Sequence, residues 1–176
     1  MEIQRYNNTA ILIHWLMAIM IFAMIGLGFY MVGLEKGSDE RSWFFALHKS
    51  IGLTLALLAL IRLVWKLSSI QPALPDYIAP LQRKMATATH HLLYLMMFIQ
   101  PVSGYISSSF SGYKTKFWGI PLPHWGWKNP ELNDLFTGIH EISAFCLILL
   151  LLLHIAGVIY HLYKKQTDLF KRMWFG

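Results

Sequence analysis

Histidines are the residues of this 176-residue chain whose spacing best suits chemistry, and there are eight of them. His140 and His154 lie fourteen positions apart within one apolar run, residues 137–161. In an α-helix, fourteen residues return a side chain to within about 40° of its starting direction, about 21 Å further along the axis. Both imidazoles therefore face the same way at two different depths. Because histidine is a common axial ligand of haem iron, this spacing suits two stacked haems on one helix.

The composition indicates a protein of the lipid bilayer. Hydrophobic residues make up 56% of the chain and charged residues only 14%, against about 25% charged residues in an average soluble domain. A helix needs about 20 apolar residues to cross a bilayer. Four runs reach that length: residues 10–31, 43–65, 90–110 and 137–163. We therefore expect an all-α fold, an integral membrane four-helix bundle in which residues 1–176 form a single four-span domain.

The distribution of Lys and Arg orients these spans. With the N-terminus inside, nine cations fall on the inner side: Arg5, Arg62, Lys66, Arg83, Lys84, Lys164, Lys165, Lys171 and Arg172. Six fall on the outer side: Lys36, Arg41, Lys49, Lys114, Lys116 and Lys128. Six acidic residues accompany these outer cations. The positive-inside rule then places both termini in the cytoplasm. Attraction to anionic lipid headgroups explains the net positive charge of the chain, so no nucleic-acid partner is expected.

This topology sorts the histidines by depth. His48 and His140 lie within spans near the outer side, and His14 and His154 lie in the inner half. Ionisable side chains inside a membrane are rare and usually functional. A haem with two histidine ligands needs imidazoles at equal depth on facing helices, and the pairs His48–His140 and His14–His154 meet this requirement. At the inner level, three further histidines compete for ligation: His90, His91 and His161.

The remaining histidines have plainer interpretations. His161 lies seven residues beyond His154, on about the same face and about 10 Å nearer the inner surface, where a quinone headgroup or a haem propionate could meet it. For His90 and His91, a structural or propionate-bonding role is favoured over ligation. His124 is expected to be a solvated loop residue. The sequence has no C-x-x-C-H motif, so any haem is held non-covalently.

The longest connection, residues 111–136, is rich in tryptophan. Trp118, Trp125 and Trp127 are typical of anchors at a membrane interface. A second interpretation is that this outer loop covers or lines a pocket.

Six groups of residues, taken in their order and spacing, resemble the bacterial cytochrome b561 family. They are Ile11–Leu16 (ILIHWL), His48–Gly52 (HKSIG), Ile61–Leu63 (IRL), His90–Tyr94 (HHLLY) followed by Pro101, Ile139–Glu141 (IHE), and Leu153–His154 with His161 and Asp168–Met173 (DLFKRM). The resemblance covers essentially the whole chain, and the four-span length of the family agrees. The Trp-rich outer loop departs from the family pattern.

The resemblance implies a four-helix cytochrome of the bacterial inner membrane that holds two haem b groups. By position, His14 and His154 would ligate the iron of the inner haem, and His48 and His140 that of the outer haem. Members of this family are superoxide oxidases, which pass electrons from periplasmic superoxide to ubiquinone. His161 occupies the position that the family associates with the quinone site. No catalytic acid–base or nucleophilic residue is expected, because cofactors carry the chemistry.

Two other functions compete with this hypothesis. In the first, the same haems serve a dehydrogenase or hydrogenase partner protein, and the chain has no substrate of its own. In the second, the protein is not a redox protein, and its histidines bind a metal ion or nothing. The second alternative does not account easily for two pairs at matched depths.

Overall fold

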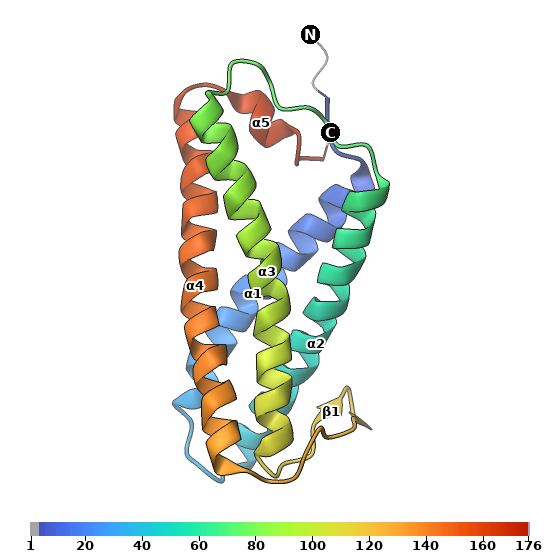
Figure 1. Cartoon of the computed structure of the whole chain (residues 1–176), viewed down its shortest axis with the longest axis vertical. Helices are drawn as coiled ribbons and strands as arrows, with labels where there is room; N and C mark the ends of the chain where they lie inside the picture. The colour runs from blue at the N-terminus through green and yellow to red at the C-terminus, as the bar shows by residue number, and fades with distance from the viewer. Residues whose placement is uncertain (1–3, 176) are drawn as a thin grey trace.

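Four long helices that run side by side form the computed structural model, which describes residues 4–175 (Figure 1). They are α1 (Asn8–Val32), α2 (Asp39–Ser68), α3 (Pro80–Phe110) and α4 (Pro130–Tyr163). A short helix, α5 (Thr167–Lys171), follows α4. An antiparallel hairpin, β1 (Lys116–Phe117) and β2 (Ile120–Pro121), lies between α3 and α4. The prediction of an all-α membrane bundle is confirmed.

Polar caps and prolines set the starts of the four helices. The side chains of Asn7, Ser38 and Asn129 each accept a hydrogen bond from the backbone N–H three residues further on. Pro80 and Pro130 occupy first helical positions, where a missing N–H costs nothing. These caps lie outside the apolar runs, so each helix is longer than its expected span. In particular, α3 begins ten residues before residue 90.

Among the described residues, three helices are long and apolar enough to cross a membrane: α1, α2 and α4. Large apolar side chains such as Ile19 and Ile142 remain 67% exposed on them, which suits contact with lipid rather than water. Helix α3 is more polar because it carries Gln100 and several serines, and yet it packs along the length of α4. A helix with such a polar face is accommodated because that face turns to the protein interior.

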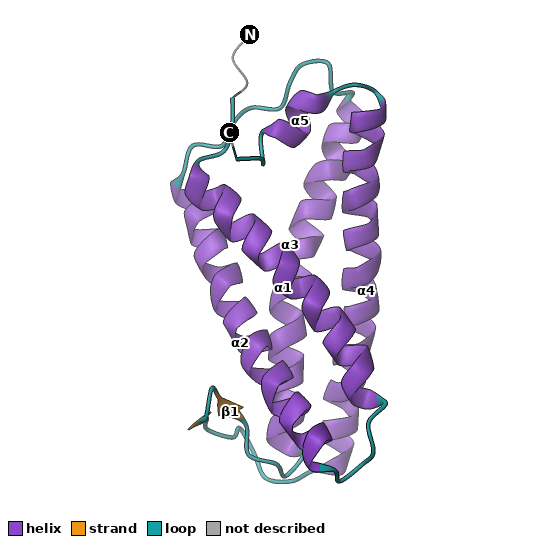
Figure 2. Cartoon of the chain, turned by 180° about the vertical axis from the view of Figure 1, so that it is seen from behind, coloured by secondary structure: helices purple, strands orange, loops and turns teal. Residues whose placement is uncertain are grey.

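The bundle consists of two helix pairs. Helix α1 packs along α2, α3 packs along α4, and α2 joins the pairs through α3. Seen from behind, α1 crosses the bundle diagonally, from beside α2 near the chain ends to beside α4 at the opposite end (Figure 2). The interior between the two pairs is where side chains of α1 and α2 can meet those of α4.

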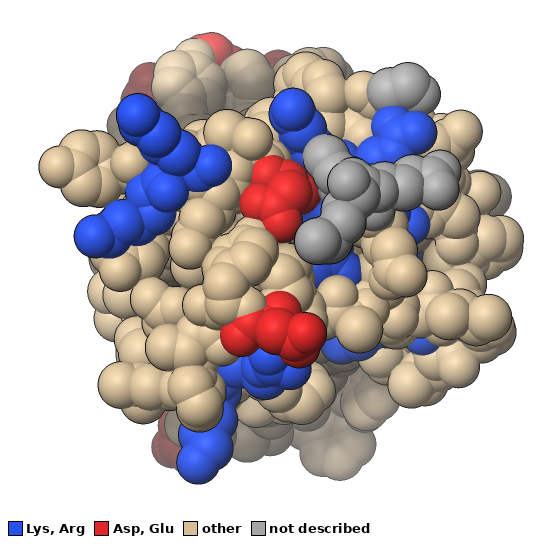
Figure 3. All heavy atoms as spheres, turned by 90° about the horizontal axis from the view of Figure 1, so that it is seen from above, with Lys and Arg blue, Asp and Glu red and all other residues tan. Residues whose placement is uncertain are grey.

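The first and the last described residues lie at one end of the bundle, with the α2–α3 connection and α5 (Figure 1). We call it the inner end, and the opposite end, which carries the hairpin and the α1–α2 turn, the outer end. Figure 3 looks onto the inner end and shows Lys and Arg side chains in several places around it.

The C-terminal segment closes the inner end. The backbone N–H of Tyr6 donates to the carbonyl of Arg172 at 3.1 Å, and the indole N–H of Trp15 donates to the carbonyl of Met173 at 2.7 Å. The phenol of Tyr77 donates to the Asp168 carboxylate. Partial burial and this hydrogen bond raise the pKa of Tyr77 to about 12. The first two contacts fix the start of α1 to the segment after α4, and the third fixes the α2–α3 connection to α5.

The outer loop folds back onto α2. The turn of its hairpin places Trp118 (φ 48°) and Gly119 (φ 91°) in the left-handed region, as a tight two-residue turn requires. The backbone N–H of Trp118 donates to Ser50 Oγ and its indole N–H donates to Thr54 Oγ1, both at 3.1 Å. Trp127, by contrast, is 83% exposed. Trp118 is therefore hydrogen-bonded to α2, whereas Trp127 is available to contact a membrane or a partner.

The expectation that His124 is solvated is wrong. This residue is half-buried, its Nε2 accepts a hydrogen bond from the backbone N–H of Thr115, and its Nδ1 lies 3.3 Å from the carbonyl of Ser109. The loop turns back over the end of α3, so the imidazole bridges two backbone groups that water would otherwise satisfy.

Candidate functional site

Two pairs of histidines face each other across the interior of the bundle. His48 of α2 and His140 of α4 have ring centroids 6.2 Å apart, and His14 of α1 and His154 of α4 show the same separation. The planes of the two rings cross at 75° in the first pair and at 70° in the second. All four residues are at least partly buried. Helix α4 thus supplies one member of each pair, and the α1–α2 half of the bundle supplies the other.

The separation of the rings fits a shared metal ion. A metal–imidazole bond is about 2 Å long and the ring centre lies about 1 Å beyond the nitrogen, so imidazoles on opposite sides of one ion have centroids about 6 Å apart. His90 of α3 is the inner competitor, with its centroid 5.3 Å from that of His154. This distance is too short for that arrangement. The geometry therefore favours His14 as the partner of His154.

The number of protein ligands that a metal centre needs differs between haem iron and a bare metal ion. Within residues 4–175, no group of three or more His, Cys, Asp or Glu side chains is arranged to hold a metal ion. A bare zinc or copper ion in a protein generally takes at least three side-chain ligands. Haem iron needs only axial ligands from the protein, because the macrocycle supplies the rest. Paired histidines therefore fit haem, whose macrocycle supplies the remaining ligands of the iron.

Helix α3 orients the outer histidine of α4. The ring nitrogen Nδ1 of His140 lies 2.8 Å from the backbone carbonyl of Gln100, to which it can donate, and 3.4 Å from Ser103 Oγ. Histidine ligands commonly donate the second N–H to a carbonyl in this way, which fixes the ring and leaves Nε2 for the metal. The amide nitrogen of Gln100 lies 3.2 Å from Nε2. For Nε2 to ligate a metal, that amide would have to turn away.

Two further observations concern the surroundings of the outer pair. Among the described residues, His48 Nδ1 is a buried nitrogen with no hydrogen-bond partner, a costly state for a polar group. Glycines also border both rings. A Cβ built on Gly28 would lie 3.6 Å from His48 Cε1, and one built on Gly104 would lie 2.9 Å from His140. At Gly104, α3 approaches the ring of His140 too closely for any larger residue.

The inner level is more cationic. A cavity of about 100 Å³ lies among α1, α2 and α3 beside the inner pair, and its lining includes Arg62, Lys66 and His90. Arg62 is held by the carbonyl of Ala10, to which it donates at 3.0 Å. Carboxylates such as haem propionates are the ligands that such cations attract. His90 therefore sits where a propionate-bonding role is chemically reasonable.

His161 lies apart from both pairs. Its Nδ1 is 2.7 Å from Oε1 of Gln166, at the bend between α4 and α5. The adjacent Tyr160 hydroxyl accepts a hydrogen bond from Gln82 of α3. Two exposed cations follow, Lys164 and Lys165. His91 faces a separate groove on α3.

Sequence reasoning missed the contribution of α3 to the outer site. Gln100, Ser103, Gly104 and Ser107 recur at three- and four-residue spacing and so share one helix face. Ser107 Oγ lies 2.7 Å from Thr137 Oγ1, and Ser143 donates to the Gln100 side chain. The polar stripe was visible in the sequence. Its partner helix could be known only from the packing of α3 on α4.

A membrane bundle whose histidines pair at two levels of one helix has the architecture of a membrane-embedded b-type cytochrome. Residues 5–176 match the family model described as prokaryotic cytochrome b561, and the chain belongs to this family. Membership makes it a bacterial membrane protein of electron transfer, and implies b-type haem. The resemblance drawn from the sequence motifs is confirmed.

Two curated relatives span nearly the same length. Cytochrome b561 homolog 2 of Escherichia coli (strain K12) is 31% identical over 182 residues, which cover 97% of this chain and 91% of that protein. A protein of Yersinia pestis named probable superoxide oxidase CybB is 24% identical over 174 residues, which cover 97% of this chain and 96% of that protein. The chain is therefore similar to these cytochromes from end to end.

Proposed function

We propose that this protein is a dihaem b-type cytochrome that moves electrons from superoxide, on the periplasmic side, to ubiquinone in the inner membrane. The observation that supports it most is the equal 6.2 Å separation of two histidine pairs on one helix. The name of the Yersinia pestis relative supports the choice of donor. The single four-span domain over residues 1–176 stays a prediction of the sequence.

Four histidines would hold the two haems. His48 and His140 would ligate the outer haem iron, and His14 and His154 the inner one. When bound, the haems supply one-electron transfer between the two membrane faces. The carbonyl of Gln100 orients His140 through Nδ1, so that Nε2 would bind iron once the Gln100 amide turns away from it. Arg62 and Lys66 offer positive charge to carboxylates beside the inner pair.

The cationic inner end supports an orientation with both chain ends in the cytoplasm. Nine Lys and Arg residues belong to that end in the sequence, against six at the outer end, and the positive-inside rule assigns the richer side to the cytoplasm. The protein would then cross the inner membrane four times, with α3 shielded by α4 on its polar face.

The outer face would receive an anionic donor. Lys114, Lys116 and Lys128 are exposed there, and Lys49 follows His48. Electrostatic focusing raises the encounter rate of a small anion by about 10- to 1,000-fold. Two superoxide ions would each give up one electron and leave as molecular oxygen.

The inner face would receive ubiquinone at His161. Reduction of one quinone to quinol takes the two electrons from two superoxide ions, and two protons from the cytoplasm. An imidazole relays protons well near neutral pH, because its unperturbed pKa is about 6.5. The contact between His161 Nδ1 and Gln166 orients the ring, and two exposed cations, Lys164 and Lys165, follow it in the sequence.

One observation favours a second candidate function, that of an electron-transfer subunit for a dehydrogenase or hydrogenase. The outer loop exposes Trp118, Ile120 and Trp127. Exposed aromatic residues near a redox site are typical of protein docking surfaces. Such a subunit would take its electrons from the partner protein instead of superoxide.

A superoxide pulse on purified, oxidised protein distinguishes the two functions. We expect prompt reduction of the haem absorbance bands, followed by reoxidation when ubiquinone is added. Added superoxide dismutase should abolish the first step. Haem bands that are reduced by dithionite but not by superoxide would contradict the proposal and favour the partner-dependent subunit.

A further inference from the structure

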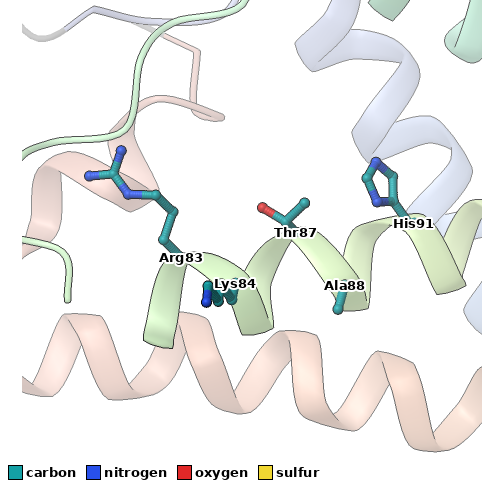
Figure 4. A pocket seen from close by; sticks show the side chains of 5 residues that line it. All are labelled: Arg83, Lys84, Thr87, Ala88 and His91. Atoms are coloured by element: carbon teal, nitrogen blue, oxygen red, sulfur yellow. The ribbon is translucent and has the colours of Figure 1, made fainter. Parts of the chain in front are cut away.

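Helix α3 carries a shallow groove at the inner end that none of the functions above uses. The groove has a volume of about 420 Å³ and is lined by Arg83, Lys84, Thr87, Ala88 and His91 (Figure 4). Arg83, Thr87 and His91 recur every four residues and therefore form one stripe along the helix. In Figure 4 these three side chains project to the same side of α3.

The lining has the chemistry of an anion site. Arg83 and Lys84 supply two positive charges, Thr87 supplies a hydroxyl, and His91 a ring nitrogen, whereas no acidic side chain takes part. All four of these residues are exposed. Arg83 makes one long hydrogen bond, 3.4 Å, to the carbonyl of Pro75. A guanidinium has five N–H donors, so most of its capacity is available to a ligand.

The depth of the groove places it at the membrane surface. Helix α3 has 31 residues and is therefore about 46 Å long, whereas the hydrocarbon core of a bilayer is about 30 Å thick. The apolar part of α3 begins near residue 90. Residues 83–91, which precede it, thus lie at the level of the lipid headgroups.

Apolar side chains flank the groove and continue from it along the helix. Met85 is exposed beside Lys84, and Leu92 and Leu95 are exposed on the turns that follow His91. A ligand with a phosphate head and hydrocarbon chains matches this sequence of polar and apolar surface. Free phosphate matches the polar part alone.

We propose that this groove binds the phosphate of an anionic phospholipid of the inner leaflet. Arg83 and Lys84 pair with the phosphate, Thr87 donates its hydroxyl proton to a phosphate oxygen, and the acyl chains lie along Leu92 and Leu95. Ala88, between the two cations and His91, leaves the floor of the groove open. The binding needs only membrane insertion and does not depend on the haem ligands or on the electron donor.

The test compares lipid retention by two charge-matched variants of the whole protein. Arg83→Gln/Lys84→Gln removes both cations of the groove. Arg5→Gln/Lys171→Gln removes two exposed cations of the same end that do not line it. Each protein, with its haem bands checked first, is titrated in detergent with phosphatidylglycerol and, separately, with phosphatidylcholine. Bound lipid is counted by native mass spectrometry.

We expect the wild type to retain phosphatidylglycerol in preference to phosphatidylcholine. The groove variant should bind phosphatidylglycerol about 25-fold more weakly, about fivefold for each cation removed. The control variant should stay within about twofold of the wild type, since its cations contribute only a long-range field. Equal losses in the two variants would overturn the proposal, because they would reflect net charge alone.

A second arm identifies the source of the phosphate. Inorganic phosphate is added to the wild type together with phosphatidylglycerol. A lipid site that uses its apolar flanks should resist displacement, so retention should not change. Displacement of the lipid by equimolar inorganic phosphate would overturn the lipid assignment and leave a site for free phosphate.

Discussion

Gly104 of α3 lies directly against the ring of His140 on α4: a Cβ at this position would be 2.9 Å from both Nδ1 and Cε1 of the imidazole. That distance is below ordinary van der Waals contact, and the backbone carbonyl of Gln100 already fixes the ring from the same helix. The closeness of α3 to α4 thus depends on a glycine at the level of the outer histidine pair.

Gly104→Ala should therefore displace His140 and weaken haem binding at the outer site. Overpacking of this kind costs about 1–3 kcal/mol, while alanine in a helix offsets about 0.5–1 kcal/mol of that cost. The haem-to-protein ratio and the thermal midpoint measure the effect. Gly26→Ala is the matched control, because a Cβ there meets nothing within 4 Å. A Gly104→Ala protein with full haem content and wild-type stability would contradict the prediction.

Single histidine replacements should separate the two sites. We expect His140→Ala to lose only the outer haem and His154→Ala to lose only the inner one, because each residue supplies one axial ligand to one pair. Haem extracted per mole of protein should fall by about half in each variant, and the residual absorbance bands should differ. If the content of either variant stayed at the wild-type level, the proposed pairing would be wrong.

His161→Ala should leave both haems in place and slow their reoxidation by quinone. The residue belongs to neither pair, and its ring contacts Gln166 instead. Removal of a positioned proton relay typically costs about 100- to 10,000-fold in rate. Stopped-flow reoxidation by ubiquinone of the reduced protein measures it. Gln166→Ala keeps the imidazole and loses only its orientation, so a smaller loss is expected there. Unchanged reoxidation in His161→Ala would remove this residue from the quinone site.

The phenol of Tyr77, which is hydrogen-bonded to Asp168, should keep its proton at a higher pH than an ordinary tyrosine does. Partial burial and the Asp168 hydrogen bond raise the pKa of the phenol to about 12, above an ordinary value of about 10. Because the folded state holds this proton more tightly, the stabilisation is present below pH 10 and is lost as the pH rises through about 12. A tyrosinate absorbance titration of the wild type, minus that of Tyr77→Phe, isolates this group. Asp168→Asn should move its pKa back toward the ordinary value.

The sequence alone was sufficient to predict the class of protein and the depths of its histidines along the helices. Hydrophobic runs of bilayer length predicted four helices, because a spanning segment must satisfy its backbone hydrogen bonds internally. The fourteen-residue spacing of His140 and His154 predicted two levels on one face, because helix periodicity is a local property of the chain. Family membership, now shown over residues 5–176, followed from short motifs in the right order.

Tertiary structure decided which side chains meet. His14 and His90 were both candidates at the inner level, and only their ring distances from His154, 6.2 and 5.3 Å, separate them. His124 was expected in solvent and instead bridges a backbone group of its own loop and one at the end of α3. The contacts of Gln100 and Gly104 with His140 likewise depend on the packing of α3 against α4. Periodicity fixes the face and depth of a residue within its own helix, whereas its neighbours depend on helix crossing and loop folding, which arise from packing of the whole chain.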